Sequence, residues 1–135
     1  MKMKVVIILT LIIAPLALTL SGEARAADPM VYGVYRALDM GEPGEVIRKD
    51  FFVNIGSKNG VGIGSRLEVF RRAPTYDLVN NQYHSDTTFP IATLKVIHVE
   101  GSTAIARLEA MKPLDKTPAI SPVTVMAGDL VQLSR

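Results

Sequence analysis

Apolar and polar residues alternate over short stretches of this chain, which is the period expected of β-strands. Phe51, Val53 and Ile55 share one face of such a run, and Leu67 and Val69 share one face of another. Further runs rich in β-branched and aromatic residues occur at 31–38, 46–49, 91–100, 103–108 and 130–133. We therefore predict an all-β fold, a small SH3-like or OB-like barrel of about six or seven short strands.

Two local features refine this prediction. Glycine is dense between the runs 51–55 and 66–71, and Asn59-Gly60 is a strong turn signal, so we expect a tight turn there that sets the register of the flanking strands. The neighbouring apolar residues Val96 and Ile97 interrupt the alternation and predict a bulge or bend, as at a barrel corner. The short spacing of the middle strands and the bend at Val96-Ile97 favour a barrel over the alternative, an immunoglobulin-like sandwich.

Residues 73–90 form a polar insert that is longer than an ordinary connection in a compact domain. Asn80-Asn81 at its middle predicts the turn of a protruding hairpin. Aromatic and apolar residues interrupt its polar sequence and supply contact area for a protein partner at low entropic cost. We predict an interaction site formed by Tyr76, Asp77, Leu78, Tyr83, His84 and Phe89. The alternative is that these side chains fold back and cover an open end of the barrel.

The first residues read as a targeting segment and not as part of the fold. Lys2 and Lys4 precede an apolar run at 5–20, and Ala24-Arg25-Ala26 matches a cleavage site of the A-x-A type. We expect a signal peptide at 1–26, with a signal helix removed by cleavage, and a single barrel domain at 27–135; the alternative is a retained membrane anchor. The expected location is the bacterial periplasm, and the absence of cysteine excludes a lipobox-type lipoprotein.

Charge and cysteine content narrow the function classes. The segment 27–135 contains 12 basic and 12 acidic residues, so no excess positive charge points to nucleic acid, and Arg71-Arg72 is expected to be a solvated strand end. The chain has no cysteine, which excludes disulfides, thiolate metal sites and cysteine nucleophiles. We predict no cofactor and, after cleavage, no membrane span.

Candidate chemistry is sparse. Gly60–Ser65 is rich in glycine but lacks the lysine of a phosphate-binding loop. His98 is expected at the edge of the core, whereas His84, with Asp77 and Asp86 nearby in sequence, is the only metal-site candidate. Glu68 and Glu100, both expected at strand positions, are the acid pair that approach across a sheet would bring together for hydrolysis. We predict neither a metal site nor an enzyme.

One resemblance is carried by the order of these motifs. Asn54-Ile55-Gly56 and the glycines at 60, 62 and 64 precede the strand at 67–71; Pro90–Val96, Ser102–Ala106 and a terminal Gly128-Asp129-Leu130-Val131 follow the insert. Over residues 46–135 this order resembles the small C-terminal barrel of flagellar assembly protein T and related bacterial envelope barrels. The resemblance implies a barrel fold, an envelope location and a non-catalytic interaction role. The N-terminal and middle domains of that family have no counterpart here, so its ring-forming role is not implied.

The sequence thus predicts an exported periplasmic module that binds a protein partner and docks on a larger envelope or flagellar structure. The alternative is a small periplasmic hydrolase or ligand-binding protein, which requires a deep pocket containing His84 or an acid pair.

Overall fold

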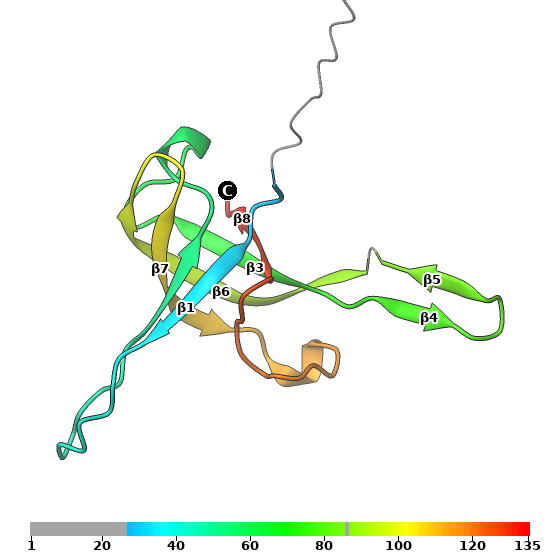
Figure 1. Ribbon diagram of the computed structural model, residues 1–135, viewed down its shortest axis with the longest axis horizontal. Coiled ribbons are helices and arrows are strands. Elements are labelled where there is room, and N and C mark those ends of the chain that lie inside the picture. The colour runs from blue at the N-terminus through cyan, green and yellow to red at the C-terminus, as the bar shows by residue number, and fades with distance from the viewer. Residues whose placement is uncertain (1–26, 86) are drawn as a thin grey trace, which may run out of the picture.

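The computed structural model describes residues 27–85 and 87–135, so the predicted signal peptide at 1–26 lies outside the described residues. Six strands form one sheet in the order β1-β2-β7-β6-β3-β8, and two more form a separate hairpin, β4–β5 (Figure 1). The strands are β1 (Val31–Arg36), β2 (Lys49–Val53), β3 (Arg66–Arg72), β4 (Thr75–Asp77), β5 (Gln82–His84), β6 (Thr88–Val99), β7 (Ala104–Met111) and β8 (Leu130–Leu133). Two short 3-10 helices, η1 (Ser57–Asn59) and η2 (Leu114–Lys116), lie in the connections.

The large sheet curls into a half-barrel, which confirms the predicted all-β barrel. At one end its two edge strands meet: the Val31 N–H donates to the Asp129 carbonyl at 2.8 Å, and the Gly128 N–H donates to the Val31 carbonyl at 2.7 Å. Met30 and Leu130 form a bridge beside them. Because one sheet encloses the core on itself, the sandwich of two facing sheets is the wrong alternative.

The hydrophobic core lies on the concave face of this sheet, where the alternating residues of neighbouring strands meet. Phe51 and Val53 of β2 and Leu67 and Val69 of β3 are all at most 1% exposed, as their alternation predicts. Each such side chain contributes about 1.5–3 kcal/mol through removal of apolar surface from water. The other buried apolar residues are Val31, Ile55, Val61, Ile91, Ala92, Leu94, Val96, Ala104, Ala106, Val125 and Val131.

Strand β6 is the 12-residue strand that joins the two halves of the sheet, since it pairs with both β3 and β7. Its register with β7 shifts between Val96 and His98, so the bulge predicted at Val96-Ile97 is confirmed. A second shift lies between Thr93 and Leu94. On β7, Ala104 and Ala106 are buried, but Leu108 is 42% exposed.

The glycine-rich connection differs from its prediction. Strand β2 pairs with β1 and β7, whereas β3 pairs with β6 and β8, so the connection crosses between non-adjacent strands and does not set their mutual register. Its chain turns through η1, and Gly60 caps that helix with φ 80°. Its two apolar residues differ, since Val61 is buried whereas Ile63 is 76% exposed.

Gly56 is required by close backbone contact. The Ser57 N–H donates to the Glu100 carbonyl at 2.9 Å, and the Lys58 N–H donates to the Gly101 carbonyl at 3.0 Å, which holds the connection against the β6–β7 turn. A Cβ at position 56 would overlap the Glu100 carbonyl oxygen and lie 2.8 Å from the Thr103 nitrogen. Glycine at position 56 therefore marks a place where two backbone segments approach closely, and not only a turn.

Candidate functional site

The predicted insert forms a hairpin that projects away from the half-barrel (Figure 1). Strands β4 and β5 pair antiparallel, with Thr75 opposite His84, Tyr76 opposite Tyr83 and Asp77 opposite Gln82. Residues 78–81 turn the chain between the two strands, as Asn80-Asn81 predicted. We call β4, β5 and this turn the arm.

The turn of the arm is shaped by the Asp77 carboxylate. It accepts hydrogen bonds from the Val79 N–H at 2.9 Å, the Asn80 N–H at 3.1 Å and the Asn80 side-chain amide at 2.7 Å. The bond from the Asn80 side chain, followed by the two backbone bonds, lowers the pKa of Asp77 below its ordinary value of 3.8. Asn81 adopts the left-handed conformation at φ 56°, which asparagine tolerates better than most residues. The turn is therefore a defined structure at neutral pH.

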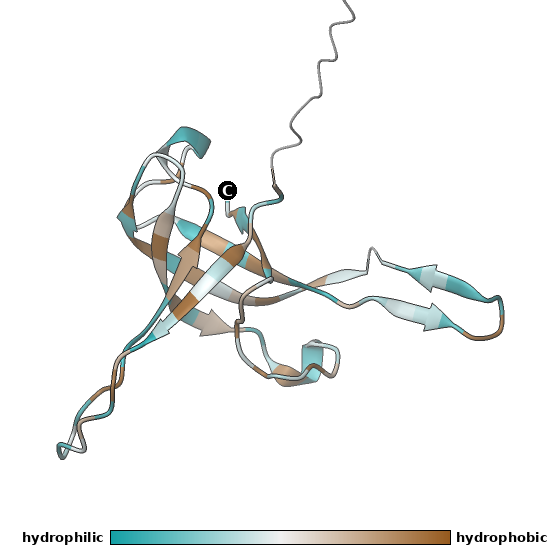
Figure 2. Ribbon diagram, viewed as in Figure 1, coloured by the Kyte–Doolittle hydropathy of each residue, from teal (hydrophilic) through white to brown (hydrophobic). Residues whose placement is uncertain are grey.

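The tip of the arm exposes two adjacent apolar side chains. Leu78 is 85% exposed and Val79 is 92% exposed, and the ribbon at the end of the arm has the brown colour of hydrophobic residues (Figure 2). Tyr76 and Tyr83 are 52% and 62% exposed, and their directly opposite register places them on one face of the hairpin. The fold of one chain leaves these groups in water.

The arm contains five of the six residues predicted for the interaction site: Tyr76, Asp77, Leu78, Tyr83 and His84. Phe89 does not belong with them, because β6 already begins at Thr88 and Phe89 is partly buried against the core. The insert therefore returns to the barrel before residue 90. The alternative, in which the insert covers the barrel end, is not observed, since Tyr76, Leu78, Tyr83 and His84 are exposed.

A shallow groove of about 420 Å³ lies on the outer side of β3 and β8, next to the base of the arm. Its apolar wall comes from Pro29, Phe70, Leu130 and Val131, and its rim from Asp28, Arg72, Thr88 and Gln132. Asp28 and Arg72 approach to 3.6 Å across the rim, and both side chains are at least half exposed. This groove is open and mainly apolar, which suits a protruding side chain better than a small polar substrate.

The residues considered for hydrolysis lie elsewhere. Neither His84 nor the pair Glu68 and Glu100 lines this groove. Glu68 pairs with Lys112 at 3.2 Å, whereas Glu100 pairs with His98 at 2.9 Å. His98 is exposed rather than at the core edge. The structure thus gives each of the two glutamates its own basic partner.

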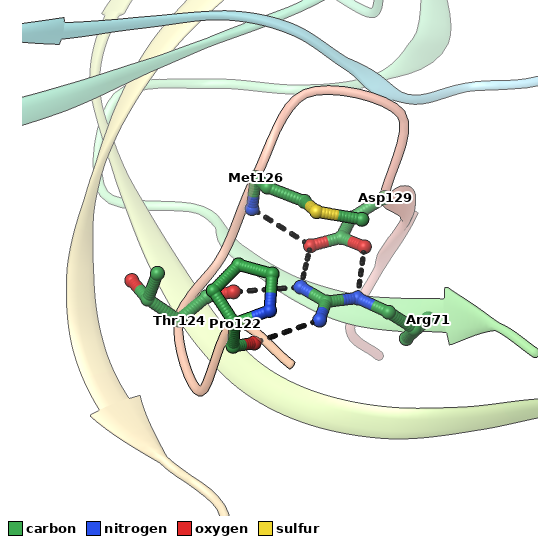
Figure 3. A network of polar contacts seen from close by, with 5 residues as sticks. All are labelled: Arg71, Pro122, Thr124, Met126 and Asp129. Atoms are coloured by element: carbon green, nitrogen blue, oxygen red, sulfur yellow. Dashed lines mark hydrogen bonds and ion pairs between the residues drawn. The ribbon is translucent and has the colours of Figure 1, made fainter. Parts of the chain in front are cut away.

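A buried ion pair was missed by the sequence reasoning, which placed Arg71 at a solvated strand end. Arg71 is 5% exposed and Asp129 is 1% exposed, with the guanidinium and carboxylate joined by two hydrogen bonds of 2.7 and 2.8 Å. Arg71 also donates to the carbonyls of Pro122 at 2.8 Å and Thr124 at 2.6 Å (Figure 3). The Met126 N–H donates to the same carboxylate at 2.8 Å.

This network ties the irregular segment before β8 to β3. Hydrogen bonding to Asp129 is the main reason that the pKa of Arg71 is raised, and it outweighs burial, which acts in the opposite direction. Each nitrogen of the buried Arg71 guanidinium therefore has a hydrogen-bond partner inside the protein, as a buried charge requires. The alternation along β3 could have indicated that Arg71 is buried, because Arg71 lies on the same inward face as Leu67 and Val69.

In residues 27–85 and 87–135, no three His, Cys, Asp or Glu side chains are grouped so that they would hold a metal ion. The helices found in these same residues are too short to cross a membrane. Comparison with known proteins adds no assignment: no protein-family model matches this chain, and no curated protein matches it in sequence.

Proposed function

We propose that this chain is an exported, non-catalytic binding module of the bacterial periplasm that docks through its arm on a larger envelope or flagellar structure. The observation that carries the proposal is the exposed pair Leu78 and Val79 on a turn held in shape by Asp77. A tip that is both apolar and ordered is typical of a surface that a partner covers.

The physical argument rests on what the arm contributes to the fold. Its strands pair with each other and with no strand of the large sheet. The apolar tip therefore gains nothing from the core of its own chain, whereas burial against a partner would remove its surface from water. Tyr76 and Tyr83 add large side chains with few rotatable bonds, which lose little entropy on binding.

Export is supported by the sequence of the N-terminal segment. The basic start, the apolar run at 5–20 and the site Ala24-Arg25-Ala26 follow the order of a secretory signal peptide. A flagellar or related envelope role is supported by the resemblance over residues 46–135 to the flagellar assembly barrels. Cell fractionation tests the location: the chain, shortened by cleavage after Ala26, is expected in the periplasmic fraction, and a full-length cytoplasmic product would contradict export.

The docking role is tested by photo-crosslinking in living cells. A photoreactive residue at position 79 is expected to give an adduct of discrete mass, because this position is in the interface. The matched control carries the same residue at position 58, which is exposed on η1 and lies outside the arm. If position 79 gives no more adduct than position 58, the arm is not a docking element and the proposal is wrong.

A further inference from the structure

The groove beside the base of the arm and the tip at its end are both mainly apolar. The groove has an apolar wall of Phe70, Leu130 and Val131, and the tip presents Leu78 and Val79. The tip is exposed, and Phe70 and Leu130 of the groove wall are partly exposed, whereas Val131 is buried at its base. A convex apolar tip and a concave apolar groove on one molecule allow two copies to cover both.

The positions of these two features define the geometry of such a contact. Arg72 is the last residue of β3 and is separated from β4 by only two residues, and Thr88 opens β6 soon after β5 ends. Both residues line the groove, so the groove lies where the arm leaves the half-barrel. Two arms laid side by side in opposite directions would therefore bring each tip to the other copy's groove. The same patch is used twice, which is the arrangement of a closed two-fold dimer.

We propose that two copies of this chain form a dimer by exchanging arms, with Leu78 and Val79 of each copy seated in the other's groove. The inference rests on the proposed function in one respect, the assignment of the arm as the docking element, and it names the arm's partner as a second copy. The paired arms are then the part of the dimer that meets the envelope structure.

Charge supports a second copy as the occupant. The insert 73–87 contains no lysine or arginine and two acidic residues, Asp77 and Asp86, whereas the rest of 27–135 contains all 12 basic residues and 10 acidic ones. The insert of one copy is therefore weakly attracted to the body of another. In the dimer, Asp77 approaches Arg72 at the groove rim, which in the single chain lies 3.6 Å from Asp28. Because the charges cancel over 27–135, two copies do not repel each other.

The arm itself benefits from the exchange. An isolated two-stranded hairpin is marginal in water, and three or more strands or a packed face are needed for stability. Tyr76 and Tyr83 lie on one face of the hairpin, more than half exposed. A second arm packed against this face shields both rings and adds order without any change in the barrel.

Sedimentation equilibrium of the purified protein, over a range of concentrations, tests the dimer. The unchanged chain is expected to sediment as a monomer–dimer equilibrium, with a dissociation constant that rises with salt. The tip variant Leu78→Ser/Val79→Ser and the groove variant Arg72→Glu are each expected to raise that constant by at least about tenfold. Lys58→Glu, an equal charge reversal on η1, serves as the control and is expected to leave it nearly unchanged.

Mapping a crosslink separates this inference from the proposed function. A photoreactive residue at position 79 is expected to give an adduct of two chains, joined at Phe70, Leu130 or another groove residue of the second copy. A monomer at every concentration, or a dimer crosslinked outside the groove, overturns the arm exchange. If the adduct in cells joins position 79 to a different envelope protein, the exchange is wrong and the docking role survives. No adduct at position 79 contradicts both.

Discussion

The half-barrel and the arm place their side chains in opposite ways. In the half-barrel a charged pair, Arg71 and Asp129, is buried, and hydrogen bonds from within the chain satisfy it. In the arm an apolar pair, Leu78 and Val79, is exposed, and no core of the chain covers it. Both invert the usual preference for charge outside and apolar groups inside.

The difference is that only one of the two inversions is compensated within the chain. The buried charges have hydrogen-bond partners within the chain, so removing one of them alone is costly, and their bonds explain the path of the segment before β8. Hydrogen bonds to Asp77 hold the turn that carries the exposed apolar pair, but the two side chains themselves remain in water. We infer that the first region is complete in a monomer and that the second is completed by association.

The largest expected effect lies in the buried pair. Asp129→Ala leaves the Arg71 guanidinium buried without its carboxylate, so the free energy of unfolding should fall by about 3–5 kcal/mol. Urea unfolding followed by circular dichroism measures this change. The double variant Arg71→Met/Asp129→Leu, which removes both charges, should be less destabilised than the single variant. If the single variant unfolds like the unchanged protein, the pair does not hold the segment before β8.

The next effect concerns backbone contact in the glycine-rich connection. Gly56→Ala forces its Cβ against the backbone at Glu100 and Thr103, and overpacking of this kind costs about 1–3 kcal/mol or more of unfolding free energy. Gly62→Ala is the matched control, since the nearest atom to its Cβ is the Ser65 side-chain oxygen at 3.8 Å. Equal thermal midpoints for the two variants would show that the close approach at Gly56 does not exist.

A small effect on stability is expected from the tip of the arm. Leu78→Ser/Val79→Ser removes apolar groups that are already in water, so the monomer's free energy of unfolding should change by no more than about 0.5 kcal/mol. Unfolding is measured at a concentration below that of dimer formation. A loss as large as that of a buried apolar residue would mean that the tip packs on its own barrel, against the contrast drawn between the two regions.

The smallest effect is a local dependence on pH. The pKa of Asp77 is lowered in the folded protein, so its contribution to the turn is fully present above the ordinary value of 3.8 and is lost as the pH falls through the lower folded value. Amide NMR signals of Val79 and Asn80 should shift in that acidic range while those of Leu67 and Val69 stay constant. Asp77→Asn should remove the transition; if the shifts persist in this variant, another group shapes the turn.

The fold was predictable from sequence wherever apolar and polar residues alternate clearly enough to show which face of a strand is buried. Phe51 and Val53, and likewise Leu67 and Val69, point into the core as their spacing indicates, and the adjacent pair Val96-Ile97 correctly marks a bulge. The path of the glycine-rich connection was not predictable, because pairing of β2 and β3 with other strands is decided by contacts distant in the chain. Local turn signals say that the chain bends and not which strands become neighbours.

In the candidate site, too, features set by local sequence were predictable and features set by contacts distant in the chain were not. The hairpin and its exposed tip follow from Asn80-Asn81 and from apolar residues isolated in a polar segment. Phe89 was assigned to the insert because the segment's end was drawn at Pro90, whereas β6 begins two residues earlier with Thr88. Arg71 was misjudged because arginine is seldom buried, and its partner Asp129 lies 58 residues away.

The contrast between the two regions is tested most directly by hydrogen–deuterium exchange at low and high protein concentration. The amides of Leu67 and Val69 in the half-barrel should exchange slowly and equally at both concentrations, because the fold is complete in one chain. The amides of Tyr76 and Tyr83 in the arm should exchange quickly in dilute solution and become protected as the concentration rises. Arm protection that does not depend on concentration would contradict completion of the arm by a second copy.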